Sequence, residues 1–281
     1  MILKNKSYLI WCSEWILLGL LLLGTYGICV EPYKIEIHHV YINDSTMGEI
    51  LKGKCVVQLS DLHMGTIGKR ENEVLKILDK LQPDLVFLTG DYVRWSGAYD
   101  AALDFLSRLK AKIGIWAVMG DYDYSRSRKS CIFCHEEGSG KQSRRHSVRF
   151  LRDTVEPITL AHGVFWIGGI DYEGEHSFDV EKKMLFLKEN RPLIILCHNP
   201  LFFDRIDSED DVLILAGDTH GGQIPLPAWL LGILGYEKNA RYSQGLFEKG
   251  KKKMFVSRGI GTSHLPIRIC RRPEVVVLHF R

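Results

Sequence analysis

The sequence of 281 residues has no strong charge imbalance, because 37 basic and 34 acidic residues leave a net charge of only +3. A general polyanion-binding protein is therefore not indicated. Few aromatic residues alternate with the arginines of its one basic stretch, so we predict no nucleic-acid partner. The sequence gives no sign of an obligate protein partner either.

Cysteine is scarce and odd in number. The seven cysteines are scattered between Cys12 and Cys270, which argues against a disulfide framework and favours reduced thiols. Cys131, Cys134 and His135 match a haem-attachment string and half of a zinc site. Because no second half lies nearby, we interpret them as an incidental or redox-labile pair.

Long hydrophobic runs are absent except for one, over residues 8–30. Its length suits one crossing of a bilayer, which needs about 20 mostly apolar residues. Glu14 weakens the run but lies near its N-terminal side, from where it can reach the interface. A cleaved signal peptide and a buried helix are the alternatives. No small-x-small cleavage pattern follows, so we predict an uncleaved single-pass anchor over residues 1–32.

The side of the membrane is left open by the sequence. Lys4 and Lys6 precede the run and Lys34 is the nearest base after it, so the positive-inside rule places the body outside the cytoplasm. The reduced-looking cysteines favour the cytoplasmic side instead.

Residues 33–281 are predicted to form one α/β domain. Five apolar, β-branched runs each end in polar residues, and the carboxyl ends of such buried strands converge on one edge of a sheet. Helical spacing over residues 69–81 and 98–111 separates the first runs. Runs at 164–170, 254–257 and 275–280 lack long helices between them, which predicts a second, more antiparallel sheet.

The polar residues at these strand ends are candidate metal ligands: Asp61, His63, Asp91, Asp121, His198, Asp218 and His220. Four carboxylates and three imidazoles suit divalent cations. A pair of such ions needs a bridging carboxylate, for which Asp91 is our candidate. A single Asp or His at a strand end is usually a cap or turn former, but five coincidences make that explanation improbable.

In these motifs the sequence resembles the calcineurin-like metallophosphoesterases, whose pattern is Asp-x-His, Gly-Asp, Gly-Asn-His-Asp/Glu, His and Gly-His-x-His. The resemblance extends to their membrane-anchored branch through residues 217–223, 242–247, 256–263 and 272–274. It implies a four-layer α/β fold, in which two packed mixed β-sheets are flanked by helices. It also implies that Asp61, His63 and His220 bind one metal, that positions 121, 198 and 218 bind the other, and that Asp91 bridges.

Three positions depart from the family pattern. Asp121 replaces Asn, Asp218 replaces His, and Tyr122 replaces the His that stabilises the transition state or protonates the leaving group. The extra carboxylates predict two hard divalent ions, manganese first, with magnesium, iron and zinc as alternatives. We predict Asp91, Tyr122 and Asp123 as catalytic residues. A tyrosine is a poor proton donor near neutral pH, so a diphosphate with a good leaving group is favoured as substrate.

Two segments interrupt the pattern. Residues 125–149 form a basic insertion next to the metal edge, whose Arg126 and Arg128 we predict to bind substrate, together with Arg258. A solvated loop is the alternative for the insertion, and Arg258 and Arg268 have the alternative of pairing with acids. Residues 224–236 form an apolar segment, interpreted either as core or as an interfacial segment that dips into lipid.

Together these features predict hydrolysis of a lipid-linked nucleotide at the bacterial inner membrane, with the cytoplasmic face favoured by the substrate. Within the family, the closest resemblance is to the enzymes of lipid A synthesis that cleave UDP-2,3-diacylglucosamine to UMP and 2,3-diacylglucosamine 1-phosphate. The alternatives are a metallophosphoesterase for another phosphodiester or phosphomonoester, and a membrane-tethered binding protein that has lost catalysis.

Overall fold

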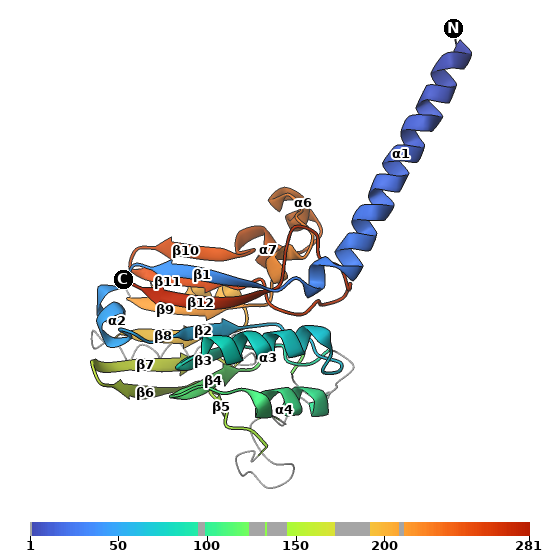
Figure 1. Ribbon diagram of the computed structural model, residues 1–281. Helices are drawn as coiled ribbons and strands as arrows, with labels where there is room; N and C mark the ends of the chain where they lie inside the picture. Colours follow the sequence, from blue (N-terminus) through green and yellow to red (C-terminus); the bar gives the residue numbers. More distant parts are fainter. Residues whose placement is uncertain (1, 95–98, 124–132, 134–144, 172–191, 208–210) are drawn as a thin grey trace.

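The computed structural model describes residues 2–94, 99–123, 133, 145–171, 192–207 and 211–281. Two six-stranded sheets pack against each other within these residues, and the long helix α1 (Ile2–Cys29) projects from the body (Figure 1). The strands of the first sheet are, in spatial order, β1 (Glu36–Ile42), β12 (Glu274–Phe280), β2 (Val56–Leu59), β3 (Leu85–Thr89), β4 (Gly114–Val118) and β5 (Arg149–Phe150). Those of the second are β10 (Gly245–Lys249), β11 (Lys252–Val256), β9 (Val212–Ala216), β8 (Leu193–Leu196), β7 (Gly163–Gly169) and β6 (Thr154–Leu160).

Both sheets are mixed, as the resemblance implied. In the first sheet β2, β3 and β4 are parallel, while β12 runs antiparallel to β2. In the second sheet β7, β8, β9 and β11 are parallel, and only the edge strands β6 and β10 pair in the antiparallel sense among the described residues.

The second sheet is the more antiparallel of the two, as expected, since it has two antiparallel pairs, β6–β7 and β10–β11, and the first sheet has one, β12–β2. The run at 275–280 was wrongly placed in it, because β12 belongs to the first sheet and lies between β1 and β2. The four central strands of the second sheet are parallel, and β9 and β11 are joined by two short helices, α6 (Ala228–Ile233) and α7 (Glu237–Arg241). Such a crossover leaves no extended helical periodicity to mark a parallel connection.

Helices α3 (Lys69–Leu81) and α4 (Tyr99–Arg108) cover the outer face of the first sheet (Figure 1). The first turn of α3 is capped where the Gly68 N–H donates to Glu71 Oε2 at 2.9 Å, and the helix ends at Gln82 in a left-handed conformation. The remaining short helices are α2 (Ser45–Ile50), η1 (Glu31–Tyr33), η3 (Pro200–Arg205) and η4 (His220–Gly222).

The apolar core follows these layers. One cluster fills the space between the sheets, where Phe87 and Trp116 of the first sheet meet Phe165 of the second. A second cluster packs α3 and α4 on the first sheet, and a third packs η3 on the second. Because both faces of the central strands are covered, their sequences read as continuous apolar runs.

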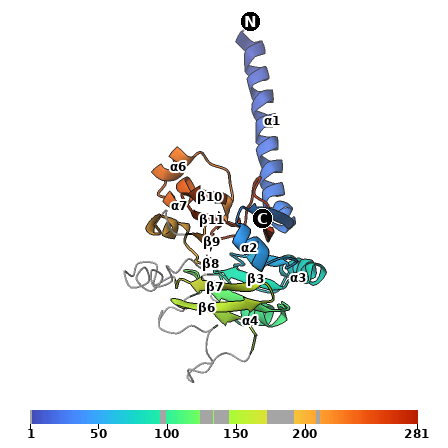
Figure 2. The same ribbon diagram turned by 90° about the vertical axis from the view of Figure 1, so that its left-hand side faces the viewer.

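Helices α1 and α6 project from the same side of the two sheets, as the views in Figures 1 and 2 agree. The C-terminal end of α1 is fixed to the body there, since Gly27 O accepts a hydrogen bond from Arg268 N at 2.9 Å. The buried Glu31 continues this contact by accepting from Arg271 N at 2.6 Å. The direction in which α1 leaves the body is therefore set by the loop that follows β11.

Candidate metal centre and its cleft

The structure brings the seven predicted ligands together where the carboxyl ends of strands from both sheets meet. Asp61 and His63 follow β2, and their backbone N–H groups donate to Gly90 O at 3.0 Å and Asp91 O at 2.9 Å. Across the sheets, Asp218 N donates to Asp61 Oδ1 at 3.0 Å. These bonds tie the ends of β2, β3 and β9 to one another, so the ligand positions are set by backbone contacts.

Most of these ligands have a strained backbone. Positive φ angles occur at Asp61 (51°), His63 (42°), Asp91 (58°), Asp218 (73°) and His220 (54°). Non-glycine residues rarely adopt this conformation, and such residues cluster at functional sites. Gly120 shows how closely the loops approach, because a Cβ there would lie 2.1 Å from Asp91 Oδ1.

The first group of ligands surrounds the imidazoles of His63 and His220. Their Nε2 atoms are 3.0 Å apart, His63 Nε2 is 3.2 Å from Asp91 Oδ2, and His220 Nε2 is 3.5 Å from Asp61 Oδ1. The four side chains are buried and direct their metal-binding atoms to one point. This set matches the ligands predicted for one ion together with the bridging carboxylate.

The second group is centred on His198. Its Nε2 atom lies 3.4 Å from Asp91 Oδ2 and 3.7 Å from Asp121 Oδ1, so the same oxygen of Asp91 faces both groups. His198 Nδ1 is 2.8 Å from Thr89 O, which places a ring proton on Nδ1 and directs Nε2 toward the carboxylates of Asp91 and Asp121. Asp91 thus occupies the position expected of a bridging ligand.

These residues fit a pair of divalent ions. Among the described residues, the buried atoms Asp61 Oδ2, Asp121 Oδ1 and His198 Nε2 have no hydrogen-bond partner. Buried polar atoms are normally paired, so three such atoms without a hydrogen-bond partner are suited to ligate a cation. Asp218 differs from the others, because its carboxylate is paired with the ammonium group of Lys238.

Three buried groups dominate the electrostatics of the centre: the carboxylates of Asp61 and Asp91 and the imidazole of His198. Burial alone would raise the pKa of Asp91, but the charges of His198 and His63 hold it well below its usual value. Burial and the neighbouring Asp91 raise the pKa of Asp61 to about 6. Asp91 raises the pKa of His198 well above its usual value despite burial. The site therefore carries concentrated negative charge that attracts protons or metal cations.

Asp123 lies behind the ligands and does not line the cleft. Its buried carboxylate accepts hydrogen bonds from the backbone N–H groups of Asp91 (2.7 Å), Tyr92 (2.7 Å) and Gly120 (2.8 Å). Burial and the charge of Asp91 raise the pKa of Asp123 to about 7, against the effect of these backbone donors. This geometry suits a residue that positions the turns carrying Asp91 and Asp121.

A cleft of about 570 Å³ opens at the ligands. Asp91 and Asp121 lie at its inner end beside Tyr122, whose backbone N–H donates to Asp91 Oδ1 at 3.1 Å. Burial and the acidic ligands raise the pKa of Tyr122 to about 12, so its phenol stays protonated. Four apolar residues also line the cleft, and we call them its apolar wall: Ile224, Leu226, Leu231 and Leu265.

Among the polar residues of this cleft that were not predicted from the sequence, two contact predicted site residues. Lys238, from α7, reaches Asp218, and His264 Nε2 lies 3.5 Å from Tyr122 Oη. His264 directly follows the stretch 256–263 that resembles the membrane-anchored branch. This proximity in sequence was the one signal that could have pointed to His264. Lys238 had no such signal, and neither residue belongs to a family motif.

Comparison with known proteins now decides the family. Residues 56–222, more than half of the chain, match the family described as Metallophos: Calcineurin-like phosphoesterase. The chain belongs to this family. It is therefore a metal-dependent phosphoester hydrolase, and divalent ions are its implied cofactors.

Three relatives of this calcineurin-like phosphoesterase extend beyond the matched region. An uncharacterised metallophosphoesterase of Bacillus subtilis, YkuE, is 27% identical over 270 residues, which cover 90% of this chain and 89% of the relative. LpxG of Chlamydia trachomatis, a UDP-2,3-diacylglucosamine pyrophosphatase, is 25% identical over 299 residues, which cover 89% of this chain and 90% of the relative. A Danio rerio transmembrane protein with a metallophosphoesterase domain is 27% identical, and this chain spans 59% of its length.

Of the three predicted substrate-binding arginines, Arg258 is among the described residues of this phosphoesterase, and it does not line the cleft. Arg258 donates from Nε to Glu274 Oε2 at 2.7 Å and also forms an ion pair with Glu36. Arg126 and Arg128 lie outside the described residues, as do Cys131, Cys134 and His135. A substrate role for the arginines therefore stays a prediction.

Arg268 is completely buried within the phosphoesterase domain. Its guanidinium donates to Gly261 O at 3.0 Å and to Arg258 O at 2.8 Å, and it lies 3.4 Å from His220 Nδ1. Burial lowers the pKa of Arg268 to about 9. These contacts make it a support for the loop that carries the ligand His220.

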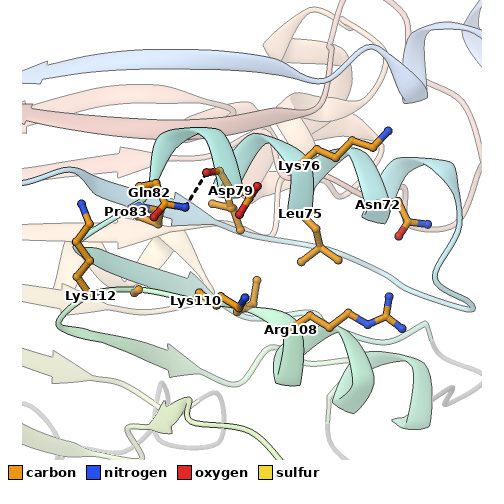
Figure 3. Close-up of a pocket in the computed structure, with 12 residues that line it drawn as sticks. Asn72, Leu75, Lys76, Asp79, Gln82, Pro83, Arg108, Lys110 and Lys112 are labelled. Carbon is orange, nitrogen blue, oxygen red and sulfur yellow. Dashed lines mark hydrogen bonds between the residues drawn. The ribbon is translucent and has the colours of Figure 1, made fainter.

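A second cavity, of about 710 Å³, lies between α3 and α4 (Figure 3). Lys76, Arg108, Lys110 and Lys112 give it a basic rim, and Gln82 Nε2 donates to Asp79 O at 2.8 Å. Among the described residues, none of the predicted ligands lines this cavity. The chemistry of the phosphoesterase therefore belongs to the smaller cleft.

Proposed function

We propose that this phosphoesterase hydrolyses a phosphoanhydride in a membrane lipid, namely UDP-2,3-diacylglucosamine, to UMP and 2,3-diacylglucosamine 1-phosphate in lipid A biosynthesis. The observation that carries this proposal is the composition of the cleft, which is lined both by the candidate metal ligands and by the apolar side chains of Ile224, Leu226, Leu231 and Leu265. A relative named as the pyrophosphatase for this substrate supports it. The long apolar helix α1 and the exposed apolar residues of α6 support it too.

Membrane attachment is supported by α1. Among the described residues, one stretch is long and apolar enough to cross a bilayer, Trp11–Tyr33, with a mean hydropathy of 1.7. Only 6% of its most apolar window is buried in the protein, unlike a core helix, and a relative is named a transmembrane protein. We propose that this helix anchors the enzyme in the bacterial inner membrane.

Helix α6 supports contact with the same membrane. Trp229 is 67% exposed and Ile233 is 75% exposed, and the helix projects from the side of the sheets that carries α1 (Figure 2). Exposed apolar side chains gain about 1.5–3 kcal/mol each when they leave water. We propose that residues 224–236 lie in the membrane interface, with the cleft opening toward the lipid headgroups.

Each predicted ligand has a role in this proposal. Asp61, His63 and His220 would hold one ion, Asp121, His198 and Asp218 the other, and Asp91 would bridge. When bound, two such ions activate a water molecule and neutralise charge on the phosphoryl oxygens. Four carboxylates favour hard ions, and we propose manganese first, with magnesium, iron and zinc as alternatives. Tyr122, which stays protonated, would donate a hydrogen bond to a phosphoryl oxygen.

The substrate also suggests a membrane face. UDP-sugar lipids are made on the cytoplasmic side, and Cys12, Cys29, Cys55 and Cys270 are free thiols among the described residues. We therefore place the domain on the cytoplasmic face of the membrane, although the distribution of lysines around α1 favours the opposite orientation.

Phosphorus NMR of UDP-2,3-diacylglucosamine with detergent-solubilised protein and manganese tests the proposal. We expect the wild type to release UMP and the Asp91→Ala variant to release none, because the bridging ligand is lost. Hydrolysis of a generic aryl phosphodiester without turnover of the lipid would leave the alternative of another phosphoester substrate. A purified protein that binds no divalent ion would support the alternative of a tethered binding protein.

A further inference from the structure

The cleft lacks an imidazole at the position where the family resemblance implies one. Tyr122 stands there, and a phenol, whose ordinary pKa is about 10, gives up its proton poorly near neutral pH. Hydrolysis of an ester whose leaving oxygen is basic needs such a proton. Another residue of the cleft is therefore required if the enzyme is to cleave esters of that kind.

His264 is placed to meet this need. Its Nε2 atom lies 3.5 Å from Tyr122 Oη, and both side chains line the cleft that holds Asp91 and Asp121. Tyr122 is fixed on its other side by the ligands, since its ring packs edge-on against His63 with centroids 4.8 Å apart. The phenol thus bridges the metal ligands and the imidazole.

His264 also has access to water. It is an exposed residue at the mouth of the cleft, in the loop between β11 and β12, whereas the imidazoles of His63, His198 and His220 are buried among the carboxylates. An imidazole in this environment exchanges protons with solvent between turnovers. Among side chains, imidazole is also the one with an unperturbed pKa nearest to neutrality.

We propose that His264 is the catalytic acid of this phosphoesterase. A water molecule attacks phosphorus, the bond from phosphorus to the leaving oxygen breaks, and its electron pair stays on that oxygen. The imidazolium of His264 carries two ring protons, of which it gives one to this oxygen and donates the other to Tyr122 Oη, while the proton lost by the attacking water passes to solvent. Tyr122 keeps its own proton, and its oxygen orients the imidazolium. The proposal rests on the phosphoester hydrolysis of the family and not on the lipid substrate.

The test compares two diesters that differ only in the leaving group, methyl 4-nitrophenyl phosphate and methyl phenyl phosphate, with the full-length protein and manganese. General acid catalysis contributes about 10²–10⁴-fold, and the contribution grows with the basicity of the leaving group. We expect His264→Ala to slow kcat for the phenyl ester at least about 100-fold and for the nitrophenyl ester less than about 5-fold. His162→Ala, at an exposed histidine outside the cleft, is the matched control.

Two further variants separate proton donation from positioning. His264→Gln keeps a hydrogen bond to Tyr122, but its amide cannot act as a proton donor near neutral pH. We therefore expect it to behave like His264→Ala. Tyr122→His in the His264→Ala background is expected to restore cleavage of the phenyl ester. Equal losses for both esters, or full activity of His264→Gln, would overturn the proposal. Cleavage of the diesters without cleavage of the lipid would leave it standing and count against the lipid substrate alone.

Discussion

The two walls of the cleft differ in how they are built. The ligand wall, Asp61, His63, Asp91, Asp121, His198, Asp218 and His220, consists of strand ends held by backbone hydrogen bonds, with positive φ angles at five positions. The apolar wall, Ile224, Leu226, Leu231 and Leu265, comes from α6 and from two loops, one before α6 and one after β11. The ligands are thus fixed by the sheets, whereas the apolar side chains are carried by peripheral segments, where binding specificity commonly resides.

The largest effect should come from disturbing the support of the ligand wall. In Asp123→Asn, an amide NH₂ group replaces one carboxylate oxygen and faces backbone N–H donors that now lack an acceptor. An unpaired buried group costs about 1–3 kcal/mol, so we expect a drop of that size in the free energy of unfolding. We also expect manganese affinity and activity on every substrate to fall at least about 100-fold. A loss of about 1.4 kcal/mol in the binding free energy of each ion is a tenfold loss, and the site is expected to hold two ions.

Urea unfolding, metal titration and diester hydrolysis would measure these changes. Asp79→Asn, at an exposed position on α3, is the control and should alter none of them. An Asp123→Asn protein with normal stability but no activity would show instead that Asp123 takes part directly in catalysis.

Changing the exposed side of α6, outside the cleft, should affect one substrate class only. In Trp229→Ser/Ile233→Ser, two exposed apolar side chains are lost from α6, and both walls of the cleft are untouched. If α6 lies in the membrane, about 3 kcal/mol of interfacial contact disappears, and turnover of the lipid substrate in vesicles should fall about 100-fold. Hydrolysis of a water-soluble diester should not change.

The matched control for this variant is Ile113→Ser, which removes an apolar side chain that is 38% exposed and lies outside the cleft. Equal losses on lipid and soluble substrates in the α6 variant would mean that α6 shapes the active site and does not contact the membrane.

Lys238 connects the two walls, since α7 directs its ammonium group onto the ligand Asp218. This ion pair competes with a metal ion for the same carboxylate. We expect Lys238→Met to tighten manganese binding about tenfold, which corresponds to about 1.4 kcal/mol. Isothermal titration calorimetry would measure the affinity, with Lys76→Met on α3 as the control. Weaker binding would indicate that Lys238 holds Asp218 in its liganding position.

The ligand wall was largely predictable from the sequence, and the apolar wall was not. Each ligand ends an apolar strand run, so periodicity and motif spacing place it at the common edge. His264 and Lys238 reach their partners through contacts 142 and 20 residues apart in sequence, with no local pattern to mark them. The helix expected at 69–81 is confirmed, whereas the parallel order of the second sheet depends on a crossover without long helices.

The smallest effect should come from a region that belongs to neither wall. His38 on β1 contacts the buried Glu274 of β12, with 2.8 Å between His38 Nδ1 and Glu274 Oε2. This hydrogen bond raises the pKa of His38, because it outweighs the opposing effect of burial. A histidine with a raised pKa in the folded state binds a proton more tightly there than in the unfolded chain. Its contribution to stability is therefore complete below its unfolded pKa of about 6.5 and disappears as pH rises through the folded pKa.

His38→Gln should consequently be less stable than the wild type at pH 5.5 and equally stable at pH 9. Because His38 is partly exposed, the difference at low pH should be only about 0.5 kcal/mol, or 1–2 °C in Tm. Thermal unfolding at the two pH values measures it, and diester hydrolysis should be unchanged because the pair lies outside the cleft. A stability difference that persists at pH 9 would show that His38 contributes by packing against Phe255, whose ring centroid is 5.9 Å away, and not through its charge.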